Sequence, residues 1–186
     1  MTSAKEIMEE NIKLGKVQAY FYEIVHSQIF NVIEQRRLRG VIGNLAKKVD
    51  TYLPALDIGS GTGNIANHLR HFGLKVIACD ISLDMLKENR YTEYKVVCDA
   101  CALPFRSETF GLITAYSVVQ HFRDAKVGLE EICRVAAKGS FLYFDRLPFL
   151  DTTSERFKGL KGFFCQKFET LTWLILRPKY LKRFFE

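Results

Sequence analysis

The chain has 186 residues and a formal net charge of +6; 48% of its residues are hydrophobic and 26% are charged. This composition is ordinary for a single globular domain and excludes a low-complexity chain. No basic stretch followed by an apolar run opens the sequence, and no apolar segment is long enough to cross a bilayer, so we expect no secretory signal, no membrane span and a cytoplasmic location. Five scattered cysteines fit a reducing compartment better than a disulfide scaffold.

The first 50 residues show the apolar spacing of helices. The pattern predicts a short helix that ends near Gly15, a longer helix over residues 17–33, and a third helix after an interruption at Gly40. Tyr20 and Tyr22 lie on the longer helix, where ordinary packing is the favoured interpretation and covering a binding site is the alternative. We therefore expect residues 1–50 to form an N-terminal helical cap.

From residue 51 onward, short apolar runs alternate with helical segments. The predicted strands are residues 53–58, 74–80, 94–99, 110–116 and 140–144. Such alternation indicates parallel strands joined by right-handed crossovers. We expect an α/β fold over residues 51–150, a doubly wound and mostly parallel sheet with helices on both faces. Side chains at its carboxyl ends, namely Asp57, Asp80, Asp99 and Tyr116, would meet at the ligand-binding edge.

A glycine-rich turn, Gly59-Ser60-Gly61-Thr62-Gly63, lies between the first predicted strand and a helix. Glycine permits positive φ and close approach of a ligand, and the helix N-terminus offers unpaired N–H groups. An NAD site would require a further glycine where Asn64 stands. Asp80 can accept hydrogen bonds from ribose hydroxyls, and Asp99 from an adenine amino group. Acidic side chains around the ligand suit a cationic sulfonium cofactor, which has no phosphate groups, better than they suit a dinucleotide.

Together these motifs resemble the class I S-adenosylmethionine (SAM) dependent methyltransferases of the small-molecule type. The similar segments, over about residues 50–146, are Leu56-Asp57-Ile58-Gly59-Ser60-Gly61-Thr62-Gly63, Cys79-Asp80-Ile81-Ser82, Cys98-Asp99-Ala100-Cys101-Ala102-Leu103-Pro104-Phe105, and Glu131-Ile132-Cys133-Arg134-Val135. The resemblance implies SAM as the cofactor, held by Asp57, Gly59, Ser60, Gly61, Asp80, Ile81, Asp99, Ala100, Tyr116 and Ser117. It implies that Asp57 holds the loop or the amino group, that Asp80 binds ribose, and that Asp99 with the Ala100 N–H reads adenine.

Methyl transfer mainly requires proximity and orientation, and it needs a base only if the acceptor must lose a proton. His121 is the candidate base, although a structural role is the favoured interpretation. His68 and His71 are expected to face solvent. The Cys98–Cys101 spacing lacks the second pair that a zinc site needs, so we expect no metal.

The tail, residues 151–186, is basic and aromatic, and residues 156–186 account for the whole net charge. Two strands that usually complete the family's sheet are not visible, which predicts a shortened C-terminal half. We expect a terminal helix, with Phe164, Phe168, Leu171 and Ile175 on one apolar face, that packs in place of the missing strands. The alternative is that residues 156–186 bind a membrane surface or an anionic partner.

The sequence thus predicts a SAM-dependent methyltransferase (a transferase) acting on a small-molecule or lipid-like acceptor. The alternatives are a SAM-binding module without turnover and a methyltransferase acting on a macromolecule, with an NAD enzyme as a third. Nucleic acid is disfavoured because Ala115-Tyr116-Ser117-Val118 stands where amine-methylating enzymes have Asn/Asp-Pro-Pro-Tyr.

Overall fold

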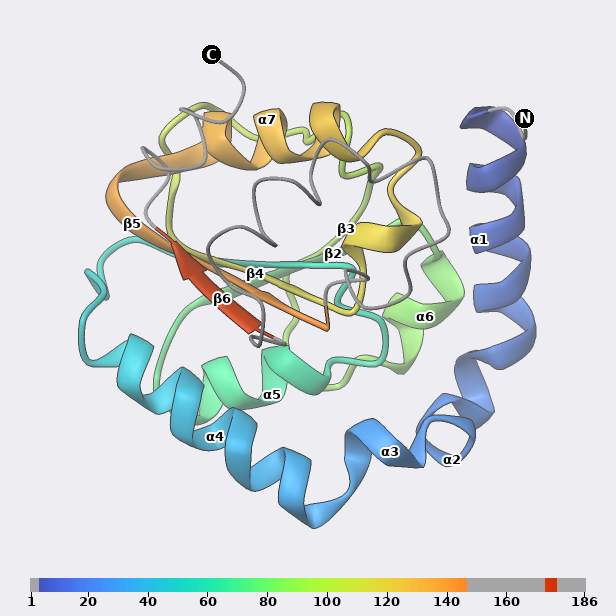
Figure 1. Cartoon of the computed structure of the whole chain (residues 1–186), viewed down its shortest axis with the longest axis horizontal. Helices are drawn as coiled ribbons and strands as arrows, with labels where there is room; N and C mark the ends of the chain where they lie inside the picture. Colours follow the sequence, from blue (N-terminus) through green and yellow to red (C-terminus); the bar gives the residue numbers. More distant parts are fainter. Residues whose placement is uncertain (1–3, 147–172, 177–186) are drawn as a thin grey trace, which may run out of the picture.

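The computed structural model describes residues 4–146 and 173–176, which form one six-stranded sheet with flanking helices (Figure 1). The strands are β1 (Ala55–Ile58), β2 (Val76–Asp80), β3 (Lys95–Val97), β4 (Phe110–Tyr116), β5 (Ala136–Asp145) and β6 (Trp173–Leu176). The sheet order is β3-β2-β1-β4-β5-β6, and the first five strands in this order are parallel. The predicted doubly wound α/β sheet is confirmed.

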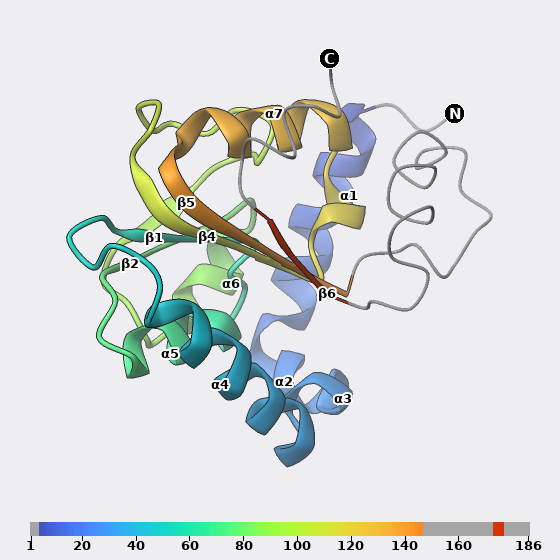
Figure 2. The ribbon, with the colours of Figure 1, turned by 60° about the vertical axis from the view of Figure 1, so that its left-hand side comes forward.

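Helices cover both faces of this sheet, as Figures 1 and 2 show. One face is covered by α4 (Val32–Ala46) and α5 (Asn64–His71), and the other by α7 (Ala125–Val135), while α6 (Leu83–Glu88) follows β2. Each face has its own hydrophobic core. Because β1 and β4 are buried along their whole length between these layers, the ligand-accessible part of the sheet is its carboxyl edge.

The N-terminal region is helical, but its predicted boundaries are wrong. It consists of α1 (Ala4–Gln18), a 3₁₀ turn η1 (Ala19–Phe21), α2 (Tyr22–Val25), α3 (Ser27–Phe30) and then α4. The expected long helix is interrupted at Asn31, whose backbone is extended and whose side chain accepts a hydrogen bond from the N–H of Glu34 at 2.9 Å. This N-cap starts a new helix because it satisfies one of the backbone donors at the helix end.

Neither glycine that was expected to end a helix does so. Gly15 lies within α1, where a Cβ would lie 2.3 Å from Ser82 Oγ, so it allows α1 to pack closely on the start of α6. Gly40 lies within α4 with open space around it. A glycine inside a helix costs only about 1 kcal/mol, which the packing of Leu38 and Ile42 on the sheet offsets.

His68 was expected to face solvent, and this is wrong, whereas His71 is exposed as expected. The His68 side chain is 4% exposed and its Nε2 lies 2.9 Å from Gln35 Oε1 between α5 and α4. Gln35 also donates to Asn64 Oδ1 at 2.9 Å, which links α4 to the first residue of α5. Burial is the main cause that lowers the pKa of His68, to about 4.

The tail contributes β6, which pairs antiparallel with β5 in the register Trp173 to Asp145 and Leu176 to Leu142. The helix expected at these residues, including Ile175, is therefore wrong. β5 would otherwise be an edge strand with unpaired backbone groups, and a strand satisfies them where a helix cannot. The rest of residues 147–186, with the predicted membrane or anionic contact, lies outside the described residues. Among the helices that are described, none combines the length and apolar character needed to cross a membrane.

Candidate functional site

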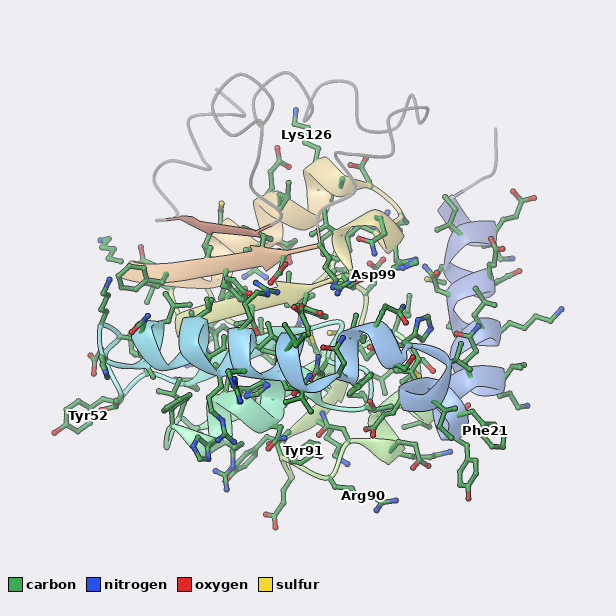
Figure 3. The ribbon with its side chains drawn as sticks, turned by 60° about the horizontal axis from the view of Figure 1, so that its bottom comes forward. Phe21, Tyr52, Arg90, Tyr91, Asp99 and Lys126 are labelled. Carbon is green, nitrogen blue, oxygen red and sulfur yellow. The ribbon has the colours of Figure 1, made fainter. Side chains whose placement is uncertain are left out.

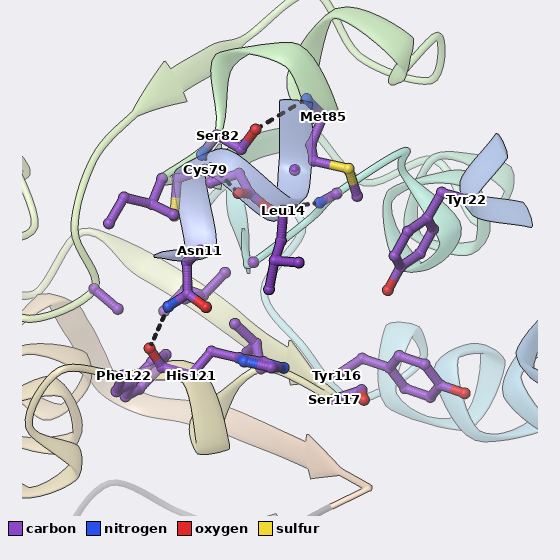
Figure 4. A pocket seen from close by; sticks show the side chains of 18 of the residues that line it. Asn11, Leu14, Tyr22, Cys79, Ser82, Met85, Tyr116, Ser117, His121 and Phe122 are labelled. Carbon is purple, nitrogen blue, oxygen red and sulfur yellow. Dashed lines mark hydrogen bonds between the residues drawn. The ribbon is translucent and has the colours of Figure 1, made fainter. Parts of the chain in front are cut away.

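A cavity of about 290 Å³ lies at the carboxyl edge of the sheet, and α1 passes across it (Figure 4). Asn11 of α1 donates a hydrogen bond from Nδ2 to the backbone oxygen of His121 at 3.0 Å, which connects the two sides of the cavity. Of the residues predicted from the sequence, those that line the cavity are Gly59, Gly61, Asp80, Ile81, Asp99, Ala100, Tyr116, Ser117 and His121. The structure thus brings together residues from the ends of four strands.

The glycine loop follows β1 and has a backbone conformation that favours glycine. Gly59, Gly61 and Gly63 have φ values of +62°, +53° and +96°. A Cβ on Gly59 would also lie 2.1 Å from Val118 Cγ2, well inside contact distance. Both the dihedral angles and the close approach therefore require glycine at position 59.

Asp57 and Ser60 are the two predicted residues outside the cavity lining. The Asp57 carboxylate is 1% exposed and accepts hydrogen bonds from Ser60 Oγ at 2.6 Å and from Thr114 Oγ1 at 2.7 Å. Asn89 Nδ2 donates to Ser60 Oγ at 3.0 Å. Burial raises the pKa of Asp57 to about 6, although the two hydroxyl donors lower it. This geometry ties the loop to β1 and β4.

Asp80, at the end of β2, faces the cavity. Its Oδ2 accepts from the N–H of Gly61 and its Oδ1 from the N–H of Ser82, both at 2.9 Å. Burial raises the pKa of this carboxyl, and the backbone donors lower it in part. Because a carboxylate has about four acceptor positions, two such bonds leave acceptors for hydroxyl groups of a ligand.

Asp99, beyond β3, lies inward in Figure 3, whereas Phe21 and Tyr52 project outward. Its Oδ1 accepts from the N–H of Cys101 at 2.8 Å, and its Oδ2 accepts from Arg123 Nε at 2.5 Å. Arg123 also lines the cavity and was not predicted, because its only sequence signal is a position in the turn after β4. The adenine-reading carboxylate implied by the resemblance is thus already paired with a cation.

Tyr116, at the end of β4, is part of a charged cluster that sequence reasoning missed. Its hydroxyl donates to Glu34 Oε1 and accepts from Arg146 Nε, both at 2.8 Å. Arg146 lies just beyond β5 and lines the cavity. Ser117 and Arg146 both have positive φ, +53° and +50°, which is uncommon outside glycine and is concentrated at functional sites.

The N-terminal region contributes one of its two candidate tyrosines to the site. Tyr22 lines the cavity and points into it from α2 (Figure 4), together with His26 and Gln28 from the same region. Tyr20 is 79% exposed and does not line it. His121 lines the cavity as an exposed side chain at the end of the 3₁₀ turn η2 (Val119–His121).

Residues 56–144 match the family described as "Methyltransferase domain". These residues contain the glycine loop, both cavity-lining carboxylates and all of the parallel strands except the ends of β1 and β5. This part of the chain therefore resembles the class I SAM-dependent methyltransferase domains in both sequence pattern and fold. The cofactor of such domains is SAM, and the residues present fit that group, because Gly59 and Gly61 line the cavity and Asp80 keeps acceptors for hydroxyl groups.

Relatives of the methyltransferase domain have related names. The chain is 38% identical over 88 residues to a demethylmenaquinone methyltransferase of Corynebacterium kroppenstedtii, covering 47% of this chain and 38% of the relative. It is 29% identical over 125 residues to a malonyl-[acyl-carrier protein] O-methyltransferase of Enterobacter lignolyticus, covering 66% and 49%. A Bacillus halodurans protein assigned as a methyltransferase superposes with a TM-score of 0.52 at 28% identity, covering 57% and 49%. The chain spans less than half the length of these two curated relatives.

Proposed function

We propose that the protein is a SAM-dependent methyltransferase that transfers a methyl group to a small-molecule or lipid-like acceptor. The observation that supports this best is the position of Asp80, which joins the glycine loop to β2 while facing the cavity. A SAM site requires a loop whose backbone can come close to the cofactor, together with a hydrogen-bond acceptor for the ribose hydroxyls.

In this proposal each cavity residue has a binding role. Asp80 accepts from the ribose hydroxyls, and Ile81 flanks the adenine, whose edge is read by Asp99 and the Ala100 N–H. The remaining residues act at the methionine end: the backbones of Gly59 and Gly61 approach the methionine part, Tyr116 and Ser117 border it, and Asp57 and Ser60 hold the loop in place from behind.

The bound cofactor supplies an electrophilic methyl group for in-line displacement. The chain's contribution is to align the acceptor and to exclude water, since α1 crosses the cavity and Asn11 bonds to the opposite side. His121 lines the same cavity and could accept a proton from an acceptor that must lose one. For an acceptor that is already anionic, no base is needed.

The acceptor class is supported by two observations. The names of the relatives refer to demethylmenaquinone and to malonyl-[acyl-carrier protein]. The cavity wall formed by the N-terminal helices is partly apolar, since Met8, Leu14 and Ile29 line it. An apolar wall suits a lipid-like or aromatic acceptor.

The test is methyl transfer from methyl-labelled SAM to a panel of isolated acceptors, comprising a demethylated quinol, aromatic and aliphatic acids, and amines. We expect label in at least one small acceptor and loss of this transfer in Asp80→Asn. SAM binding without transfer to any acceptor would instead favour the SAM-binding module. Transfer confined to protein or nucleic acid would favour a macromolecular acceptor.

A further inference from the structure

We propose that Arg146 forms a binding subsite for an anionic group of the acceptor, with a carboxylate as the simplest case. This inference rests on the proposed function and names the chemistry of the acceptor. Its starting point is the distribution of charge along the cavity. The acids that line the cavity, Asp80 and Asp99, lie at the ends of β2 and β3, whereas Arg146 lines it beyond β5, with β1 and β4 between.

The other arginine that lines the cavity has a different environment. Arg123 is paired with Asp99 at 2.5 Å, so the two charges offset each other within the cavity wall at the acidic end. At the opposite end no carboxylate lines the cavity within the described residues. Among the described residues, Arg146 is therefore the arginine at which a ligand carboxylate would meet a guanidinium with no acid beside it in the cavity lining.

Acids do lie near Arg146, but behind it. Glu34 and Asp145 do not line the cavity, and Arg37 makes the close ion pairs with them, at 2.7 and 2.6 Å. Arg146 Nη2 lies farther from Glu34 Oε1, at 3.6 Å. The four charged groups of this cluster balance, but Arg37 makes the close pairs, so Arg146 is the member whose guanidinium lines the cavity.

The guanidinium of Arg146 is held in place by its contacts. Nε donates to the Tyr116 hydroxyl at 2.8 Å, and Nη2 lies 3.5 Å from the Gln28 carbonyl oxygen. These contacts lie on the Nε–Nη2 edge, and the side chain is 36% exposed. A guanidinium fixed along one edge can present its other donors to a carboxylate without a large loss of side-chain entropy. Tyr116 and Glu34 are accordingly positioning residues for this subsite.

The backbone at Arg146 gives independent support. Its φ of +50° is strained for a residue with a side chain, and the neighbouring strand end at Ser117 is strained in the same way. The Ser117 N–H donates to the Asp145 oxygen at 3.0 Å, which joins the two strained ends. Strain of this kind persists where the surrounding structure positions a functional side chain.

The cofactor also has a carboxylate, and the test must separate the two anions. The full chain is saturated with S-adenosylhomocysteine, and octanoate and its neutral isostere octanamide are titrated by calorimetry. The variants are Arg146→Gln and Arg146→Lys, and Arg36→Gln, an exposed arginine of α4, is the control. Circular dichroism melting confirms that each variant is folded.

We expect the wild-type chain and Arg36→Gln to bind octanoate at least tenfold more tightly than octanamide. Arg146→Gln should lose this preference and Arg146→Lys should keep part of it, with S-adenosylhomocysteine affinity unchanged in all of them. Equal octanoate binding by the wild-type chain and Arg146→Gln, including none by either, would overturn the inference. So would a tenfold loss of S-adenosylhomocysteine affinity in Arg146→Gln, which would place the cofactor carboxylate at this arginine. Failure of the wild-type chain to bind S-adenosylhomocysteine would instead contradict the proposed function.

Discussion

The carboxylate of Asp80 accepts a hydrogen bond from the backbone N–H of Gly61 at 2.9 Å, across the gap between β2 and the loop after β1. The same carboxylate caps the turn into α6 through the N–H of Ser82. One side chain thus fixes the loop, holds the turn that precedes α6 and faces the cavity. Changes at Asp80 should therefore affect cofactor binding more than changes at nearby acids.

Asp80→Asn should weaken binding of S-adenosylhomocysteine by about tenfold to a hundredfold. The amide retains one acceptor but loses the charge, and a hydrogen bond to a charged group contributes about 1.5–3 kcal/mol. Isothermal calorimetry measures the change. Asp84→Asn, in the first turn of α6 and paired with Lys87, is the matched control and should bind as the wild-type chain does. Equal affinity in Asp80→Asn would remove the ribose assignment.

Two glycine-to-alanine changes should have opposite effects on stability. Gly59→Ala would place a Cβ 2.1 Å from Val118 Cγ2 at a φ of +62°, and we expect a loss of about 1–3 kcal/mol. Gly40→Ala adds a Cβ in open space within α4, and we expect a gain of about 0.5–1 kcal/mol. Urea denaturation of both variants provides the comparison. A stable Gly59→Ala variant with normal cofactor affinity would contradict the close-approach argument.

The buried imidazole of His68 should make the fold sensitive to mild acid. Its pKa is lowered to about 4 from 6.5, so the unfolded chain binds the proton more readily. The stability that the neutral ring contributes is present above pH 6.5 and is lost as pH falls toward 4, by at most about 3 kcal/mol. His68→Gln should be less stable at pH 7 but should lose less stability on acidification. Parallel stability curves for the two chains between pH 7 and 4 would refute this.

The contribution of Asp57 to the stability of the fold should have the opposite pH dependence to that of His68. Its pKa is raised to about 6 from 3.8, so the folded state favours the protonated carboxyl. Its contribution is fully present below pH 3.8 and is lost as pH rises through 6, by at most about 3 kcal/mol. The stability of the wild-type chain relative to Asp57→Asn should therefore fall between pH 4 and 6. A constant difference over that range would mean that burial does not control this carboxyl.

The pattern of apolar residues in the sequence was sufficient to predict the parallel sheet and the edge of the sheet at which a ligand would bind. Apolar runs ending in Asp57 and Asp80 mark buried strands whose carboxyl ends must meet, because a parallel sheet has one such edge. The helix boundaries near the N-terminus were not predictable from apolar spacing. The Asn31 cap interrupts residues 17–33, and Ile24 and Ile33 in that span are exposed.

The cluster around Arg146 could not be found from sequence. Arg146 and Tyr116 are 30 residues apart, and Tyr116 and Glu34 are 82 apart, so no local spacing connects them. Arg146 also follows an apolar run, and that pattern predicts a strand but gives no sign of a binding role for the residue after it. The burial of His68 was likewise missed, because its partner Gln35 lies 33 residues away on α4.

The central claim, a SAM site at the carboxyl edge of the sheet, is tested most directly by titrating the full chain with SAM and with NAD by calorimetry. The cavity that Gly61 and Asp80 line should bind one molecule of SAM per chain and give no measurable heat with NAD. Binding of NAD without binding of SAM would contradict the assignment of the site and, with it, the proposed reaction.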